Sequence, residues 1–481
     1  MKYCALIMIL GLLSAGLMAA DLQVNGSNEL NFIYRTSEDS LHTFFDDQFS
    51  FSANYGNFTF GMKFIMNLPK YNKYESNFVQ ELDANKLSTV WDERYVEYER
   101  AHFFLHGGTF EETFGSGMVF RSFKDTDFDI DTRLEGMQVK INYPKFKVKS
   151  LYGAWKSDRL DDESPNNIAY GSEIEYNLTK SLTLAGNGLA MRVIDPTNIY
   201  SEQDVWGGRL NMNLSSFDAS VEAASTSKYH MSTSERNGLG IYANSNIYLT
   251  PVNLSFGYRK YDKFDYILHD LPMVNYHSEP LNDGTAGIDE EGVQGEIRYD
   301  HGEDNSILLN YSEAWSSDKD YEMNDLYSEF SQKLNTWQFT VEYSHLEKND
   351  ELMQRWSKDL TPAMTFDFKV AGNPAHIRTE YEYIEKQYQQ DKAYHYEPLL
   401  QTDYHYKNYG ISIITETQIE KISEIGDSQF WINGEFRTTI FDSTDLLFFA
   451  GKQKGGKVCR NGSCKYVSPF NGIKLTLSTR F

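Results

Sequence analysis

The sequence is poor in proline, in cysteine and in basic residues, and it has only one long apolar run. A helical membrane protein would need several apolar runs of about 20 residues, and only residues 3–18 form one. The 45 Lys and Arg face 69 Asp and Glu, a net charge of −24 that argues against a nucleic-acid partner. A disordered acidic chain would be poor in aromatics, whereas this chain has 31 Phe, 33 Tyr and 7 Trp.

The apolar run at the N-terminus has the layout of a secretory signal peptide. Lys2 supplies a positive start, residues 3–18 are apolar, and Ala19 and Ala20 precede Asp21. We therefore expect residues 1–20 to be a signal peptide and residues 21–481 to be one exported domain.

Alternation of apolar and polar residues dominates the rest of the chain. In residues 57–68 (NFTFGMKFIMNL) every second side chain is apolar, and residues 337–343 (WQFTVEY) repeat the pattern. A period of two is typical of a β-strand with one apolar face. The sequence therefore predicts an all-β protein.

Predicted connections between these strands are alternately short and long. Short ones are expected at residues 55–57, 100–101, 144–145, 179–181, 215–216, 250–251, 302–304, 335–336, 373–374, 408–410 and 442–445. Longer or more polar connections separate them, among them residues 69–89, 111–136, 269–291 and 390–395. Nine of the 11 prolines fall in predicted connections, and Pro362 and Pro398 fall near the long-loop ends of strands.

Short turns alternating with long loops are the plan of a transmembrane β-barrel. We predict a single closed antiparallel barrel of about 24 strands (22–26 by this parse), with short periplasmic turns and longer extracellular loops. We expect no plug domain, because strand character already begins at residues 22–35. A soluble all-β propeller or sandwich is the alternative, but no repeat of 40 to 50 residues is visible.

The last strand supports a bacterial outer-membrane location. It places Ile473, Leu475, Leu477 and Phe481 on one face and resembles the C-terminal signal read by the barrel-assembly machinery, from which Thr479 departs. We therefore expect this machinery, outer-membrane lipid and lipopolysaccharide to be partners.

A charged cluster lies in the long predicted loop of residues 111–136. It consists of Arg121, Lys124, Asp125, Asp127, Asp129, Asp131 and Arg133. Carboxylates at every second position repel one another unless cations compensate them. A calcium loop is one reading, but the helix-flanked pattern fails, since position 6 is Ile130 and position 12 is Gly136. The other readings are a pore constriction inside the lumen and a solvated external loop or polar lumen-facing strand.

Two cysteines remain after the signal peptide. Cys459 and Cys464 flank Asn461-Gly462, the preferred centre of a type I′ hairpin turn, and this register would place the two cysteines directly opposite each other. We expect a disulfide in an oxidising compartment, against the alternatives of two free thiols or a metal site.

Catalytic and cofactor motifs are weak in this sequence. The eleven His are scattered, and neither a Gly-rich phosphate loop nor zinc-ligand spacing occurs. A barrel hydrolase would need a Ser-His or Asp-His constellation, which the sequence alone does not bring together. We therefore expect no enzyme activity, no cofactor and no bound metal.

Two stretches carry a family resemblance. Residues 110–136 (FEETFGSGMVFRSFKDTDFDIDTRLEG) resemble the corresponding stretch of a Gram-negative outer-membrane barrel family of unknown function. Residues 454–481, with a Gly-Gly pair, two Cys and an aromatic-rich final strand, resemble its closing hairpin. The resemblance implies fold and location only.

The function expected from these observations is a passive, porin-like channel for small hydrophilic solutes. The alternative is a non-conducting scaffolding barrel that docks secretion or surface proteins.

Overall fold

The structure is a computed structural model that describes most of the chain. The described residues are 22–36, 42–68, 88–125, 130–155, 167–194, 200–227, 237–264, 266, 268–282, 286–302, 304–420, 428–460 and 463–481. The predicted signal peptide, residues 1–20, lies outside them. Within this part of the chain, no helix is long and apolar enough to cross a membrane.

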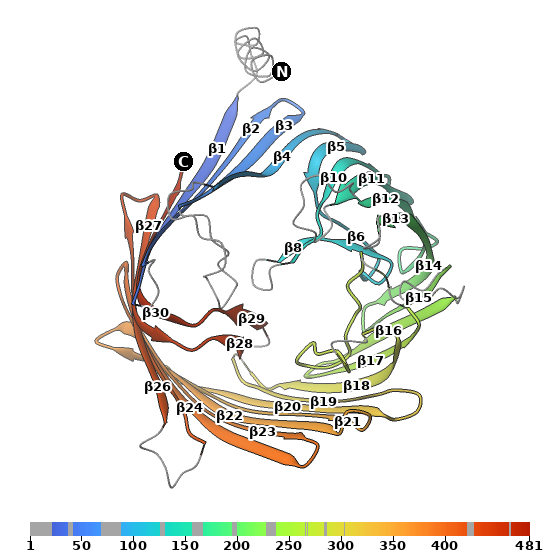
Figure 1. Cartoon of the computed structure of the whole chain (residues 1–481). Helices are drawn as coiled ribbons and strands as arrows, with labels where there is room; N and C mark the ends of the chain where they lie inside the picture. The colour runs from blue at the N-terminus through green and yellow to red at the C-terminus, as the bar shows by residue number, and fades with distance from the viewer. Residues whose placement is uncertain are drawn as a thin grey trace.

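Twenty-four strands form one antiparallel sheet that closes on itself (Figure 1). Closure is made by β1 and β30, which pair from Ser27 with Arg480 to Arg35 with Gly472. The strands of this wall are β1 (Gln23–Arg35), β2 (Thr43–Tyr55), β3 (Phe58–Leu68), β4 (Ser88–Arg100), β5 (Phe103–Phe110), β10 (Leu134–Asn142), β11 (Phe146–Trp155), β12 (Asn167–Asn177), β13 (Leu182–Ile194), β14 (Tyr200–Leu214), β15 (Phe217–Thr226), β16 (Gly238–Leu249), β17 (Val252–Asp262), β18 (Asp289–Asp300), β19 (Ser306–Trp315), β20 (Tyr321–Leu334), β21 (Trp337–Asp350), β22 (Arg355–Val370), β23 (Asn373–Tyr388), β24 (Asp391–Tyr406), β25 (Tyr409–Gln418), β26 (Gln429–Ile440), β27 (Thr444–Gln453) and β30 (Phe470–Arg480). The prediction of a closed all-β barrel of about 24 strands is confirmed.

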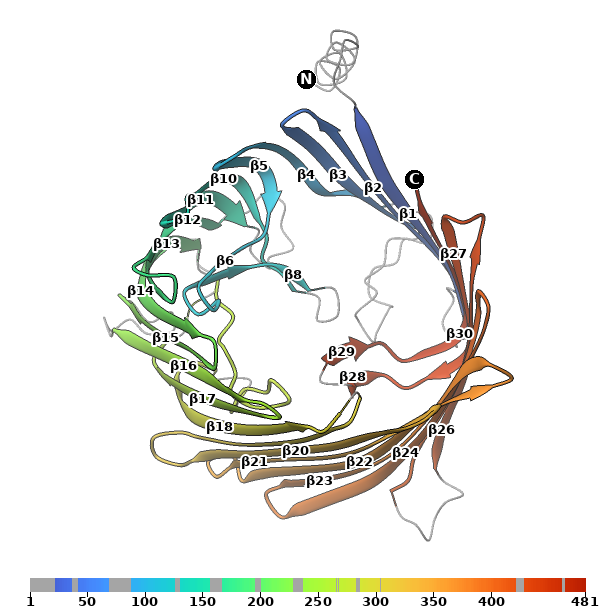
Figure 2. The same ribbon diagram turned by 180° about the vertical axis from the view of Figure 1, so that it is seen from behind.

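Six further strands form three small hairpins that lie within the ring of the wall when the barrel is viewed along its axis (Figures 1 and 2). They are β6 (Glu112–Phe114) with β7 (Phe120–Ser122), β8 (Lys124–Asp125) with β9 (Ile130–Asp131), and β28 (Gly456–Arg460) with β29 (Ser463–Val467). The expectation that no separate plug domain exists stays a prediction, but these described hairpins show that the lumen is not empty.

The predicted short connections all lie between successive wall strands, at one rim of the barrel. Ten of the eleven overlap the observed turn, while the turn expected at residues 373–374 lies two residues earlier, at 371–372. The long connection expected at residues 390–395 is wrong. β24 already begins at Asp391, because β20–β24 run for 14 to 16 residues and extend beyond the shorter wall strands.

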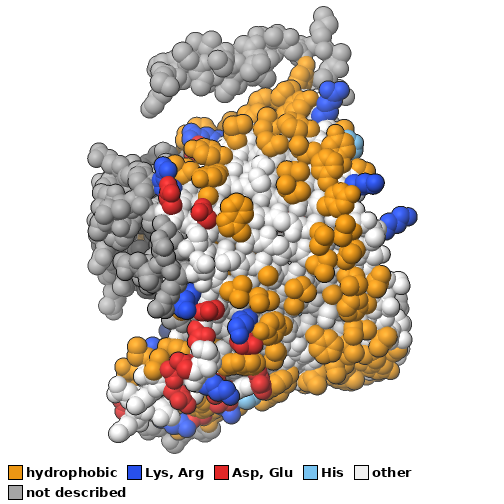
Figure 3. All heavy atoms as spheres, turned by 90° about the vertical axis from the view of Figure 1, so that its right-hand side faces the viewer, with side chains coloured by type: hydrophobic (Ala, Val, Ile, Leu, Met, Phe, Trp, Pro, Cys, Tyr) orange, Lys and Arg blue, Asp and Glu red, His pale blue; other side chains and the backbone are white. Residues whose placement is uncertain are grey.

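Along the wall strands many apolar side chains are exposed and many polar side chains are buried, the reverse of a water-soluble protein. On β12, Ile174 is 55% exposed while its neighbour Glu173 is 1% exposed. The apolar faces predicted for residues 57–68 and 337–343 likewise supply exposed Phe58, Phe60 and Trp337. Figure 3 shows hydrophobic side chains over most of the coloured outer surface, with charged side chains toward its edges. The wall therefore turns its apolar face outward and its polar face into the lumen.

Aromatic side chains gather in rows at the ends of the strands. At the short-turn rim, Tyr143 contacts Phe146, and Trp337 packs on Phe366 and Phe368. At the long-loop rim, Tyr381, Tyr383, Tyr394 and Tyr396 form one cluster, and Phe64 packs edge-on against Trp91. Two aromatic girdles bounding an apolar band are typical of transmembrane barrels.

Candidate functional site: the barrel lumen

Two long connections fold into the lumen and pack against each other on the inner wall. They are residues 111–133, between β5 and β10, and residues 264–288, between β17 and β18. The amide of Arg121 donates to Leu268 O at 3.0 Å, and the Tyr266 hydroxyl donates to Val119 O at 2.8 Å. The apolar residues of this contact form one buried core with the wall: Phe110, Phe114, Met118, Val119, Phe120, Leu134, Leu151, Trp155, Ala169, Leu189, Met191, Val193, Val205, Ala224, Tyr261, Phe264, Tyr266, Leu268 and Leu271.

Glu112 attaches the first connection to the wall. Its carboxylate lies 2.8 Å from Lys140 Nζ and 3.2 Å from Lys149 Nζ, and it accepts a 2.6 Å bond from Gln138. Burial raises the pKa of Glu112, but the hydrogen bond from Lys140 and the charge of Lys149 outweigh burial and hold this pKa below its ordinary value. Glu112 is therefore a charged anchor at neutral pH.

Arg133 is the centre of the predicted charged cluster. Its guanidinium lies 2.6 Å from Asp131, 2.8 Å from Glu93 and 3.0 Å from Asp92 on β4. Burial lowers the pKa of Arg133, but the carboxylates of Asp131 and Asp92 raise it above its ordinary value overall. Lys124 adds an ion pair with Asp92 and lies 3.9 Å from Asp131. Arg133 and Lys124 thus compensate Asp131 as expected, and they also pair with carboxylates of β4 that the sequence did not indicate.

The other residues of the cluster are more dispersed. Arg121 forms an ion pair with Asp270 of the second connection, and its guanidinium lies 4.4 Å from the Phe123 ring. Asp125 pairs through its backbone with Ile130 in the β8–β9 hairpin. Asp127 and Asp129 lie outside the described residues. Where the chain is described, no three metal-ligating side chains converge.

The second connection is held by contacts that sequence reasoning missed. Arg259 on β17 is fully buried and forms an ion pair with Glu290 on β18, which is 2% exposed. The Arg259 guanidinium also contacts Met273 Sδ, and Lys348 Nζ on β21 lies 2.9 Å from Glu279. No local spacing could reveal these contacts, because each joins a strand residue to a residue of another strand or of the connection.

His269 and His277 of this connection have different surroundings. Burial lowers the pKa of His269 to about 4, so this imidazole is neutral at pH 7. His277 instead lies between Asp325 on β20 and Ser344 on β21, at 2.8 Å from each.

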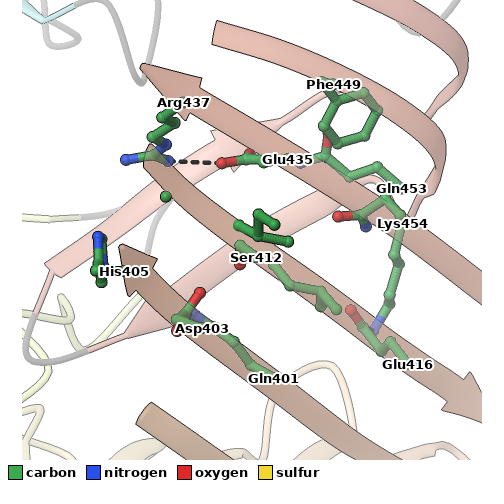
Figure 4. Close-up of a pocket in the computed structure, with 14 residues that line it drawn as sticks. Gln401, Asp403, His405, Ser412, Glu416, Glu435, Arg437, Phe449, Gln453 and Lys454 are labelled. Carbon is green, nitrogen blue, oxygen red and sulfur yellow. Dashed lines mark hydrogen bonds and ion pairs between the residues drawn. The ribbon is translucent and has the colours of Figure 1, made fainter. Parts of the chain in front are cut away.

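Across the lumen, a polar cavity of about 420 Å³ lies on the inner face of β24–β27 (Figure 4). Arg437 lies 2.6 Å from Glu435, and the amide nitrogen of Gln401 donates to Asp403 at 2.9 Å. Lys454 lies 3.5 Å from Glu416 and also pairs with Glu397. Acidic, basic and neutral polar side chains thus face this cavity: Gln401, Asp403, His405, Ser412, Glu416, Asn433, Glu435, Arg437, Gln453 and Lys454.

The cysteine hairpin β28–β29 projects from the wall beside β30 into the ring of the barrel in the view along its axis (Figure 2). Its register pairs Cys459 with Cys464 and Arg460 with Ser463, as the Asn-Gly turn predicts. The turn itself, residues 461–462, and the side chains of the two cysteines lie outside the description. The disulfide therefore stays a prediction.

The predicted C-terminal signal residues lie on the closing strand. On β30, Ile473, Leu475 and Leu477 pair with β1, and Ile473 is 41% exposed on the outer face. The backbone of Phe481 exchanges two hydrogen bonds with Gly26, at 2.8 and 3.0 Å. Recognition by the assembly machinery stays a prediction.

One solved structure with a similar fold belongs to a pilus assembly intermediate. A chain of the E. coli P pilus tip assembly intermediate PapC-PapD-PapK-PapG matches at a TM-score of 0.58 with 9% identity, over 95% of this chain and 60% of that chain. Our chain thus spans less than two thirds of that relative, and the likeness concerns the fold alone.

Two further solved structures are more distant. OpdO from Pseudomonas aeruginosa matches at a TM-score of 0.42 with 14% identity, over 72% of this chain and 95% of that one. The siderophore receptor PirA from P. aeruginosa matches at 0.49 with 9% identity, over 95% and 80%. We draw no argument from either.

Sequence comparison identifies a family but no characterised relative. No curated protein sequence matches the chain. A family model described as "Family of unknown function (DUF6029)" matches residues 1–327, which include the 110–136 stretch but not the closing hairpin. The chain, a closed 24-stranded barrel with the fold of outer-membrane proteins, therefore belongs to the DUF6029 family.

Proposed function

We propose that this barrel resides in the bacterial outer membrane and is a passive, porin-like channel for small hydrophilic solutes. The apolar outer face and the two aromatic girdles support membrane residence, because a β-sheet can span a bilayer only when it is closed and has an apolar exterior. Export by the signal peptide belongs to the same proposal, as does the absence of a separate plug domain.

The inner wall opposite the packed connections is the observation that carries the channel function. For 24 strands about 4.8 Å apart and tilted by about 40°, the circumference is about 150 Å and the diameter about 48 Å. The described residues of the two packed connections contact strands between β10 and β20, whereas Asp403, Glu416 and Glu435 on β24–β26 line a cavity. A wide lumen with a hydrated charged wall suits diffusion of small polar solutes.

A scaffolding barrel is the second candidate. The apolar core inside the lumen favours this function, because two connections packed in this way would block part of the lumen permanently. Purified protein in planar bilayers separates the two functions. Stepwise conductance supports the channel, and silence in repeated insertions, with folding verified, overturns it in favour of the scaffold.

Replacing Arg121, Lys124 and Arg133 together with Ala is expected to change single-channel conductance. The substitution removes the ion pairs of Lys124 and Arg133 with Asp92, whose side chain is 8% exposed and which is left with Lys63 at 3.6 Å, so the attachment of the connection of residues 111–133 to β4 is weakened. Arg192→Ala, on an exposed ion pair with Glu202, is the control and should conduct like wild type. If the triple variant also conducts like wild type, this connection does not constrict the pore.

A preference for cations is expected at low ionic strength. The carboxylates of the β24–β26 wall and the net charge of −24 attract cations, and the effect is strongest where the Debye length exceeds about 10 Å, below 0.1 M salt. Reversal potentials in a salt gradient should show cation selectivity, and Asp403→Asn with Glu416→Gln and Glu435→Gln should reduce it. Glu202→Gln, on an exposed pair, is the control. Anion selectivity of the wild type would contradict the expectation.

A further inference from the structure

Three side chains from separate segments form a hydrogen-bonded chain on the lumen side of the wall. Ser344 Oγ lies 2.8 Å from His277 Nε2, and His277 Nδ1 lies 2.8 Å from Asp325 Oδ1. Ser344 is on β21, Asp325 on β20, and His277 on the connection of residues 264–288. This is the connectivity of nucleophile, base and orienting carboxylate that hydrolytic triads share on unrelated folds.

Asp325 fixes both the position and the tautomer of the imidazole. Its side chain is fully buried, and its second oxygen accepts the backbone N–H of His277 at 3.1 Å. The carboxylate thus holds the main chain and the ring of the same residue. Because a carboxylate only accepts, Nδ1 must carry the proton, which leaves the lone pair of Nε2 free to accept the Ser344 hydroxyl proton.

His277 and Ser344 remain partly exposed, and a stacked pair of tyrosine rings lies beside His277. The His277 side chain keeps 17% of its surface exposed, and Ser344 is half-buried on the inner face of β21. Tyr276 packs edge-on against His277 at 5.4 Å and stacks on Tyr327 at 3.6 Å between ring centroids. A flat aryl or acyl group has an apolar surface to lie on beside the nucleophile.

We propose that Ser344, His277 and Asp325 form a hydrolytic site for small carboxylic esters that enter the lumen. Ser344 Oγ bonds to the ester carbonyl carbon while its proton passes to His277 Nε2. The tetrahedral adduct collapses, the bond to the leaving oxygen breaks, and His277 returns the proton to the alcohol. Water then attacks the acyl-serine with His277 again as the base, which releases the carboxylic acid and restores Ser344. The step needs no oxidant and no reductant.

Esters with good leaving groups are the substrate class. A developing oxyanion needs hydrogen-bond donors, and each donor is worth about 10²–10³ in rate. Activated aryl esters depend least on such donors, and the tyrosine pair offers a surface for the aryl group. This activity goes beyond the channel function and departs from the expectation of a non-enzyme.

The competing role for these residues is mechanical, since His277 also ties the connection to the wall. Purified wild-type barrel in micelles is treated with a fluorophosphonate probe and, separately, with p-nitrophenyl acetate. We expect labelling at Ser344, located by peptide mass, and hydrolysis of the ester. Ser344→Ala should abolish the labelling and reduce hydrolysis at least about 100-fold, while Asp325→Asn and His277→Gln should reduce both.

Two control variants distinguish a hydrolytic role of Ser344 from a purely structural role. Ser331→Ala removes a hydroxyl that bonds Thr340 on the same pair of strands and has no imidazole partner in that bond, so it should retain full activity. Ser344→Ala keeps the His277–Asp325 attachment, so its folding and conductance should match wild type. Hydrolysis unchanged in Ser344→Ala, labelling at another residue, or no labelling of folded wild-type protein would each overturn the proposal and leave the three residues as an anchor.

Discussion

Replacing Gly472 with Ala is expected to impair closure of the barrel. Gly472 lies on β30 opposite Arg35 at the seam with β1 and has φ of +153°. An added Cβ would lie 2.0 Å from the carbonyl oxygen of Tyr34 and 3.0 Å from Arg35 Cα, so backbone would have to shift. Backbone strain and overpacking together should cost about 2–6 kcal/mol of folding free energy.

Gly434→Ala on β26 is the matched control for this seam. The nearest atom to its added Cβ is Ser412 O at 3.7 Å, an ordinary contact. Heat-modifiability on gels measures the folded fraction of each variant after refolding into micelles, and denaturant titration measures the stability. A Gly472→Ala barrel as stable as Gly434→Ala would show that the seam tolerates a Cβ and that β1 and β30 pair less closely than described.

The wall of the barrel was predictable because its signals are local. A strand with one face toward lipid and one toward water alternates with a period of two, and short turns mark where it reverses. Even so, β4 carries an irregularity opposite Lys63 and Phe64, where the register with β3 shifts by one residue. The alternation of β3 gave no sign of it, because the extra residue, Asp92, is on the partner strand.

Proline placement shows where a local rule was misleading. Pro362 was expected near a strand end but lies in the middle of β22, and Pro398 lies in the middle of β24. The register between β22 and β23 is interrupted beside Pro362, between the pairs Leu360–Tyr383 and Ala363–Glu380. A residue without N–H is therefore accommodated by a break in the ladder rather than by the end of the strand.

The lumen was less predictable, because its contacts join segments far apart in sequence. The charged cluster around Arg133 stood out as a row of aspartates, but its main partners, Asp92 and Glu93, come from β4. The connection of residues 264–288 carried no signal beyond its length. Ser344 and His277 are 67 residues apart, and only the closed sheet brings them together.

Neutralising Glu290 alone is expected to loosen the second lumen connection near β17 and β18. Glu290→Gln keeps the shape of the side chain but leaves the guanidinium of Arg259, which is fully buried, without a counter-charge. Removing one partner of a buried ion pair costs about 3–5 kcal/mol, because the remaining charge is desolvated and uncompensated. The free energy of unfolding should fall by this amount, and protease should cleave within residues 264–282 faster than in wild type.

Replacing both partners tests whether the effect comes from the orphaned charge. Arg259→Met with Glu290→Leu removes both charges and keeps apolar volume, so the double variant should recover most of the stability lost in Glu290→Gln. Asp300→Asn on the same strand is the control, since its pair with Arg298 is about half exposed and should contribute less than about 1 kcal/mol. If Glu290→Gln and Asp300→Asn are equally mild, the Arg259–Glu290 pair does not hold the connection. If the double variant is as unstable as Glu290→Gln, the loss lies in packing around Met273 and Leu281, which surround the pair, rather than in the charge.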